Sequence, residues 1–144
     1  MNLTPRCQKA LNYAKESASR FGHSRVSSAH LVLGLLTLHG GVADNLLRKA
    51  GLSVQSVEGY LSTRRSSDED RVIYDGEPLG RSAALAFERA DAETRARKTT
   101  YLGIEHLLLG ILAEENGEAA DLFASVHVDR EKLRRSILDE IGRV

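Results

Sequence analysis

The sequence predicts an all-α protein made of two four-helix units in tandem, related by pseudo-twofold symmetry. The first observation behind this prediction is a phrase that occurs twice, "AHLVLG" at residues 29–34 and "EHLLLG" at residues 105–110. The second is that the same shift of 76 residues, from 29 to 105, aligns apolar and glycine positions along the chain without a gap: Leu3 with Leu79, Ala10 with Ala86, Leu36 with Leu112, Gly41 with Gly117 and Leu61 with Ile137. A repeat at a fixed spacing indicates a duplicated structural unit.

The composition supports a helical core within a single domain that covers residues 1–144. The chain is 42% hydrophobic and 28% charged, contains no tryptophan, and has few aromatic residues. Its core must therefore be built from Leu, Ala, Val and Ile, of which Leu and Ala favour helix. A chain of this length can bury such a core without disulfides or metal ions.

The first predicted helix begins after Thr4 and ends near Gly22. Thr4 suits the N-cap position, and Pro5 suits the first helical position, where a missing N–H costs nothing. Apolar residues then follow at helical spacing, and Gly22 is a typical C-terminal stop.

The second predicted helix, from about Ser28 to Leu38, is apolar on almost every side. Such a helix belongs at the centre of a domain. Gly34 lies inside it and matches Gly110 in the second copy, although a glycine there costs about 1 kcal/mol relative to alanine. The repeated glycine predicts that a neighbouring helix approaches closely in both copies.

A short third helix is predicted to begin at Gly41 and end at Gly51, and Ser53 can cap a fourth. The second half repeats this plan from Leu79 onward. Asp129 is the predicted N-cap of its last helix.

The boundaries that follow are about 3–62 for the first repeat and about 79–141 for the second. Residues 63–78 are polar and charged and contain a glycine and a proline, which is typical of a linker. Within it, the apolar stretch 72–74 could pair briefly or pack on the surface. A linker of this length lets the two repeats pack around an approximate twofold axis.

The charge balance argues against nucleic acid and anionic membranes as partners. Lys plus Arg and Asp plus Glu are equal at 20 each, whereas such surfaces need a basic excess on one face. The balanced charge also disfavours a helix-turn-helix reading of the short helices. There is no membrane-length apolar run and no signal segment, so we expect a cytoplasmic protein.

The histidines do not show metal-ligand spacing, and we predict no metal site. Cys7 is the single cysteine and is interpreted as a small buried apolar residue. A zinc site assembled across helices from Cys7, His23 and His30 stays open as an alternative. His30 and His106 lie in the first turns of their helices, where the helix dipole disfavours a charged imidazole. We expect both to be neutral and hydrogen-bonded to backbone at a helix junction.

Motifs for catalysis and cofactor binding are missing from the sequence. It contains no G-x-x-x-x-G-K-[ST], G-x-G-x-x-G, G-x-S-x-G or H-E-x-x-H pattern. We therefore predict no cofactor and no enzymatic activity in this chain.

The repeated pattern resembles the Clp N-terminal (Clp repeat) domain of the ClpA, ClpB and ClpC AAA+ unfoldases, and ClpC most of all. The copies "SSAHLVLGLL" and "LGIEHLLLGIL" are similar to the phrase Gly-Thr-Glu-His-Ile-Leu-Leu-Gly-Leu of the ClpC branch. The opening "LTPRCQKALNYA" is similar to the family's Phe-Thr-x-Arg start, and "FGHSRV" to its Leu-Gly-His-x-x-Ile turn. The likeness extends over nearly the whole chain.

The resemblance implies a docking module without catalytic activity of its own. Adaptor proteins and unfolded or tagged substrates would bind to it and pass to the ATPase modules for unfolding or degradation. Those modules are not in this sequence, so the chain is either a fragment attached to them in cis or a free-standing regulator that binds the same adaptors.

The ClpC branch also implies two pockets for phosphorylated arginine, each with a Thr at the start of the first helix and a Glu before the His. The physical basis is that a carboxylate pairs with guanidinium and a helix N-terminus holds phosphate. Grouping the residues by repeat, the first pocket keeps Thr4 and Arg6 but has Ala29 in place of Glu.

The second pocket, grouped the same way, keeps Glu105 but has Gly80 in place of Thr, with Arg81 beside it. Because each pocket lacks one residue, we expect docking of adaptors or hydrophobic segments rather than strong phosphoarginine recognition.

Leu3 and Leu79 stand where the family often has an aromatic residue. If they meet at the pseudo-twofold axis, they would line a shallow apolar groove for partners.

Overall fold

The computed structural model describes residues 1–64 and 69–142, and within them it confirms the predicted all-α class. The helices are α1 (Pro5–Arg20), α2 (Ser28–Thr37), α3 (Val42–Lys49), α4 (Val54–Ser62), α5 (Arg81–Ala96), α6 (Ile104–Leu112), α7 (Glu118–Ser125) and α8 (Arg130–Ile141). None of the described helices is long and apolar enough to cross a membrane.

The ends of the helices lie where their local signals predict. Thr4 Oγ1 accepts a hydrogen bond from the backbone N–H of Cys7 at 3.2 Å, and Pro5 opens α1. Asp129 Oδ1 accepts one from Lys132 N at 3.1 Å at the start of α8. After α1, Gly22 has a φ of 70°, a left-handed conformation that glycine adopts without strain. Capping chemistry that involves only near neighbours therefore sets these boundaries.

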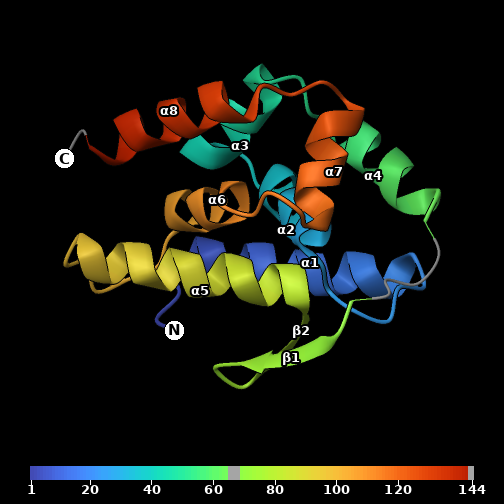
Figure 1. Cartoon of the computed structure of the whole chain (residues 1–144), viewed down its shortest axis with the longest axis horizontal. Coiled ribbons are helices and arrows are strands. Elements are labelled where there is room, and N and C mark those ends of the chain that lie inside the picture. Colours follow the sequence, from blue (N-terminus) through green and yellow to red (C-terminus); the bar gives the residue numbers. More distant parts are fainter. Residues whose placement is uncertain (65–68, 143–144) are drawn as a thin grey trace.

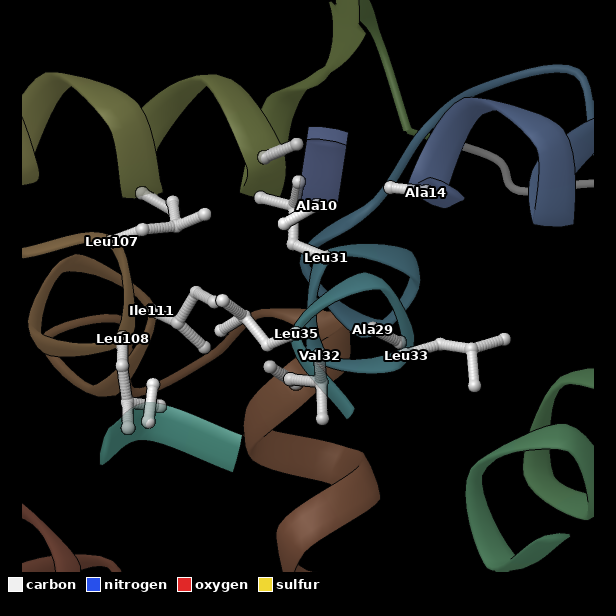
Figure 2. Packing of buried hydrophobic residues seen from close by; sticks show 14 of the residues in the cluster. Ala10, Ala14, Ala29, Leu31, Val32, Leu33, Leu35, Leu107, Leu108 and Ile111 are labelled. Carbon is white, nitrogen blue, oxygen red and sulfur yellow. The ribbon is translucent and has the colours of Figure 1, made fainter. Parts of the chain in front are cut away.

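The two glycine-containing helices form the middle layer of the fold. In Figure 1, α2 and α6 lie between a layer of α1 and α5 and a layer made by α3, α4, α7 and α8. The side chains of α2 and α6 meet in the core, and Figure 2 shows Leu35 and Ile111 facing each other between them. The prediction that the helix around Gly34 is central is confirmed, since residues 28–36 are all buried.

Both helical glycines lie against the backbone of a neighbouring helix. A Cβ added to Gly34 would lie 2.2 Å from Ala10 O in α1, and one added to Gly110 would lie 2.1 Å from Ala86 O in α5. Real Cβ atoms do not approach backbone oxygens that closely, so glycine is required at both positions. The repeated glycine is thus explained by the same α1–α2 and α5–α6 contact in each repeat.

The repeats interlock through the segments that precede α1 and α5. Thr4 N donates to Leu102 O at 3.0 Å, just before α6 of the other repeat. At the pseudo-equivalent place, Gly80 N donates to Val26 O at 2.7 Å, just before α2. Further contacts across the repeats join α3 to α8 and α2 to α7. Each repeat therefore places the start of its first helix beside the central helix of its partner repeat.

Part of the predicted linker is folded. Residues 71–80 form an antiparallel hairpin of β1 (Arg71–Tyr74) and β2 (Glu77–Gly80), so the brief pairing considered for 72–74 is present and extends beyond the predicted linker into the start of the second repeat. Val72 pairs with Leu79, and the Tyr74 hydroxyl donates to Asp91 Oδ2 of α5 at 2.8 Å. Packing of alternate residues against α5 stabilises strands that are too short to be read from the sequence. The linker residues 65–68 lie outside the described part of the chain.

Candidate functional site

The first candidate site lies where the two repeats meet and is formed by Thr4, Arg6 and Glu105; we call it the composite site. The Thr4 bond to Leu102 O brings the N-terminus of α1 beside the first turn of α6. A Cβ added to Gly103 would lie 3.0 Å from Glu105 Oε2 and 3.7 Å from Thr4 Cγ2, so both side chains border the same point.

Arg6 reaches the composite site from the exposed side of α1. Its Nη2 donates to His39 O at 2.9 Å. The same nitrogen would lie 2.9 Å from a Cβ added to Gly41, and Ile104 Cδ1 would lie equally close to that Cβ. Arg6 therefore lies between the start of α3 and the start of α6. Three helix N-termini, those of α1, α3 and α6, thus surround the composite site, and helix N-termini favour negatively charged groups.

Glu105 is the acidic group of the composite site. It is half-buried and, among the residues that the structure describes, has neither an ion pair nor a hydrogen bond. Because no described group pairs with it, the Glu105 carboxylate is available to a cationic group on a partner.

Cys7, near Glu105, is a protonated core residue. Burial, with a smaller contribution from Glu105, raises the pKa of its thiol to about 12.

The pseudo-equivalent site at the start of α5 is closed by the chain itself; we call Ser28, Ser82 and Glu69 the closed site. Glu69 Oε1 accepts hydrogen bonds from the Ser82 hydroxyl at 2.9 Å and from Ser82 N at 3.2 Å. Ser82 Oγ accepts from Ser28 N, and Ser28 Oγ accepts from Ala119 N, both at 2.8 Å. The N-termini of α2, α5 and α7 are thereby linked to one carboxylate.

The predicted grouping of the pocket residues by repeat is wrong. Thr4 of the first repeat lies beside Glu105 of the second, whereas Gly80 lies beside Val26, three positions before the buried Ala29. One site therefore brings together the Thr before the first helix and the Glu before the His, whereas the other has Gly80 and Ala29 at those two positions. A Cβ at Gly80 would lie 2.6 Å from Glu69 Oε1, so glycine at this position leaves room for that carboxylate.

The comparison with known families agrees with this architecture. The model of the Clp repeat (R) N-terminal domain matches residues 2–126 and, in a second match, residues 79–144. The chain belongs to the Clp N-terminal domain family. In Clp ATPases this domain is a non-catalytic part.

Curated relatives of this Clp N-terminal domain are subunits of Clp ATPases. The chain is 31% identical over 139 residues to a probable ATP-dependent Clp protease ATP-binding subunit of Chlamydia pneumoniae, covering 96% of this chain and 16% of the relative. It is 30% identical over 142 residues to the negative regulator of genetic competence ClpC/MecB of Bacillus subtilis, covering 97% and 17%. The chain thus spans about a sixth of the length of these relatives.

Solved Clp-type N-terminal domains share the fold. The N-terminal domain of ClpD from Arabidopsis thaliana matches with a TM-score of 0.78 and 18% identity over 98% of this chain and 95% of that one. The Hsp104 N-terminal domain from Candida albicans matches with a TM-score of 0.79 and 18% identity over 100% and 94%. At this identity the likeness concerns the fold alone.

The other predicted docking residues of this Clp domain do not join the composite site. Arg81 is exposed at the start of α5 and makes no ion pair with any described residue. Leu79 is 1% exposed and pairs with Val72, whereas Leu3 forms a bridge with Leu102 at the opposite end of α5. The groove expected between Leu3 and Leu79 is therefore not formed, because α5 separates the two leucines.

The central histidines are bonded to backbone, as predicted for this Clp domain. Ser27 N donates to His30 Nδ1 at 2.8 Å, so His30 Nε2 carries the proton and donates to His23 Nδ1 at 2.9 Å. His23 Nε2 in turn donates to Arg64 O at 3.2 Å. Burial, and then the neighbouring His23, lower the pKa of His30 to about 4. Cys7 has no place in this chain of bonds, and the described residues do not bring Cys7, His23 and His30 together as a cluster of metal ligands.

His106 repeats the arrangement of His30 in a weaker form. Gly103 N donates to its Nδ1 at 3.0 Å, which confirms the predicted bond to backbone. Burial lowers the pKa of His106, and Arg97 contributes in the same direction, while Glu105 opposes the change. His106 is half-buried, unlike the fully buried His30.

Glu69 is the site residue that the sequence analysis missed. It lies in the stretch read as a linker, at a position where periodicity carries no information. The only available signal was indirect: the second repeat has Gly80 where the first has the N-cap Thr4, so its first helix needs an acceptor from elsewhere.

Proposed function

We propose that this chain is a non-catalytic docking module of a Clp-type ATP-dependent unfoldase, which binds adaptor proteins and unfolded or tagged substrates. Its place in the Clp N-terminal domain family supports the proposal. The observation that carries it is the composite site, where a partly exposed and unpaired Glu105 lies beside the N-terminus of α1 among the described residues. Binding there would hold proteins for delivery to ATPase modules in cis.

The chemistry of the composite site favours a partner group that carries both charges. Glu105 can pair with a guanidinium, while Arg6 and the start of α1 can hold an anion. A phosphorylated arginine has both parts in one side chain. The expectation of weak phosphoarginine recognition rested on grouping the residues by repeat, and the cross-repeat pairing of Thr4 with Glu105 removes that reason. We therefore include phosphoarginine among the ligands of this one site.

The test is calorimetric titration of the chain with free phosphoarginine. Titration with arginine, which lacks the phosphate group, is the comparison. We expect one binding site per chain and an affinity for phosphoarginine at least about tenfold above that for arginine, because two charged contacts are lost with the phosphate. Glu105→Ala should weaken binding about tenfold or more.

The control is Glu131→Ala, which removes an exposed first-turn carboxylate of α8 that pairs with Arg134 at 3.8 Å. This variant should bind like the parent. Binding that survives Glu105→Ala, or a second equivalent ligand in the parent, would contradict the assignment of the site.

A further inference from the structure

The β1–β2 hairpin presents two unlike faces. Val72 and Leu79 are directly opposite in the register, and with Tyr74 they lie on the face that packs on the body of the domain. Because side chains alternate along a strand, Arg71, Ile73 and Pro78 share the other face. All three side chains are exposed. Ile73, with 59% of its surface exposed, is one of two exposed large hydrophobic residues in the described part of the chain. In Figure 1 the hairpin projects beyond α5 at the edge of the molecule.

A cavity continues this open face toward α1. It has a volume of about 420 Å³ and is lined in part by Lys15, Arg25, Arg71 and Pro78. Arg71 and Pro78 belong to both the cavity and the hairpin face, so the two are continuous. We call Lys15, Arg25, Arg71, Ile73 and Pro78 together the hairpin surface. A cavity of this size is typical of those that accept a side chain or small ligand.

The hairpin surface carries positive charge that the described residues do not fully neutralise. Arg71 makes no ion pair with any of them, and Lys15 pairs with Glu77 at 2.6 Å. The lining of the cavity that the structure describes contains no carboxylate. The lining of the cavity therefore carries cationic groups beside the apolar side chains of Ile73 and Pro78, and the acidic residues Glu69, Asp70 and Glu77 lie outside this lining.

Arg25 is a further cationic residue of the cavity lining. Its Nη1 donates to Ser24 O, but its Nε is buried and has no hydrogen-bond partner among the described residues. Arg25 nevertheless lines the cavity, so a carboxylate that enters it would lie close to the Arg25 guanidinium.

We propose that the hairpin surface docks an acidic segment of a protein partner. An apolar side chain of that segment packs on Ile73 and Pro78, and a flanking carboxylate pairs with Arg71 and Arg25. This surface is separate from the composite site and adds a second contact of opposite chemistry, because the composite site offers Glu105 to a cation whereas the hairpin surface offers cations to an acid.

The experiment uses the whole chain, labelled with nitrogen-15, and two synthetic hexapeptides as probes. One has a central Leu-Phe pair flanked by two acidic residues on each side, and the other has serines in place of the acids. We expect the acidic peptide to shift the amide resonances of Arg25, Arg71 and Ile73, with an affinity that falls as salt is raised. The serine peptide should leave these resonances unchanged.

Variants separate the two parts of the surface. Arg71→Glu should weaken the acidic peptide about fivefold to tenfold, because an attractive charge becomes repulsive. Ile73→Ser should weaken it by a similar factor through lost apolar contact, roughly threefold to tenfold. Arg135→Glu, an exposed arginine of α8 with no ion pair among the described residues, is the matched control and should not change binding.

The outcomes distinguish this proposal from the proposed function. Glu105→Ala should leave the acidic peptide bound, so loss of phosphoarginine binding alone would not affect the hairpin surface. Equal binding of both peptides, an unchanged affinity in Arg71→Glu, or concentration-dependent self-association through this face in sedimentation would overturn it.

Discussion

The composite site and the closed site share the same backbone arrangement but differ in whether side chains of the chain itself occupy them. At both, the segment before a first-layer helix bonds to the chain just before a central helix of the other repeat. Thr4 and Glu105 leave the composite site with an unpaired carboxylate among the described residues, whereas Glu69 and two serines complete the closed site from within. The two copies of the duplicated scaffold therefore differ: one keeps a carboxylate without a described partner, and the other is completed by groups of the chain itself.

The physical reason lies in the N–H groups at helix N-termini, which need acceptors. At the start of α1 the Thr4 side chain supplies one locally. Gly80, at the same position before α5, has no side chain, and Glu69 replaces it from outside the helix. Once a carboxylate of the chain occupies these donors, they are no longer available to an anion from a partner.

The largest predicted effect concerns what the two repeats share. Gly34→Leu and Gly110→Leu should each lower the free energy of unfolding by at least about 3 kcal/mol, because the new side chain meets a backbone oxygen of α1 or α5. Urea denaturation measures this. Gly59→Ala in α4, where a Cβ meets nothing within 4 Å, is the control and should be neutral or stabilising by up to about 1 kcal/mol. Tolerance of either leucine would disprove the equivalent packing of the repeats.

The next effect separates the two sites. Glu69→Ala should destabilise the chain by about 1–3 kcal/mol, since Ser82 loses the acceptor for its N–H and its hydroxyl. Glu105→Ala should cost less than about 0.5 kcal/mol, because no described group depends on that carboxylate. Thermal and urea unfolding of the two variants tests this.

Glu69→Gln adds a control for charge. Burial raises the pKa of Glu69, so its ionised form is costly to keep inside, and glutamine retains an acceptor without the charge. This variant should be about as stable as the parent at neutral pH. Equal losses in Glu69→Ala and Glu105→Ala would mean that the two sites do not differ in the way described.

A further effect concerns the paired histidines and depends on pH. His30 has a folded pKa of about 4, below the usual 6.5, so between these pH values the unfolded chain binds a proton that the folded chain does not. The stability that this provides is present above pH 6.5 and is lost as the pH falls through 4. Proton NMR titration of the imidazoles should show His30 titrating below the half-buried His106. The reverse order would contradict the difference in burial.

Much of the fold was predictable because its signals are local. Thr4 and Pro5 indicate the start of α1, and the apolar residues on every side of α2 indicate a central helix. The repeated phrase located the second central helix in the same way. The hairpin was foreseen only as brief pairing of residues 72–74, without its second strand, because the strands are four residues long and depend on α5 for their burial.

The site was predictable in its residues and not in their grouping. Thr4, Arg6 and Glu105 were named, but they were assigned to different pockets, and Leu79 was expected at a surface although it is buried. Periodicity shows which face a residue occupies within its own helix. It carries no information on which repeat supplies the neighbouring helix.

By itself, the sequence determined the duplication, the helices with their caps, and the need for glycine at the centre of each repeat, because these depend on neighbours along the chain. Only the tertiary structure decided that Thr4 meets Glu105 and that Glu69 closes the other site. Those contacts join residues far apart in the chain, and pairing within a repeat or across the repeats satisfies the same local pattern equally well. The choice between them is made by how the two repeats pack against each other.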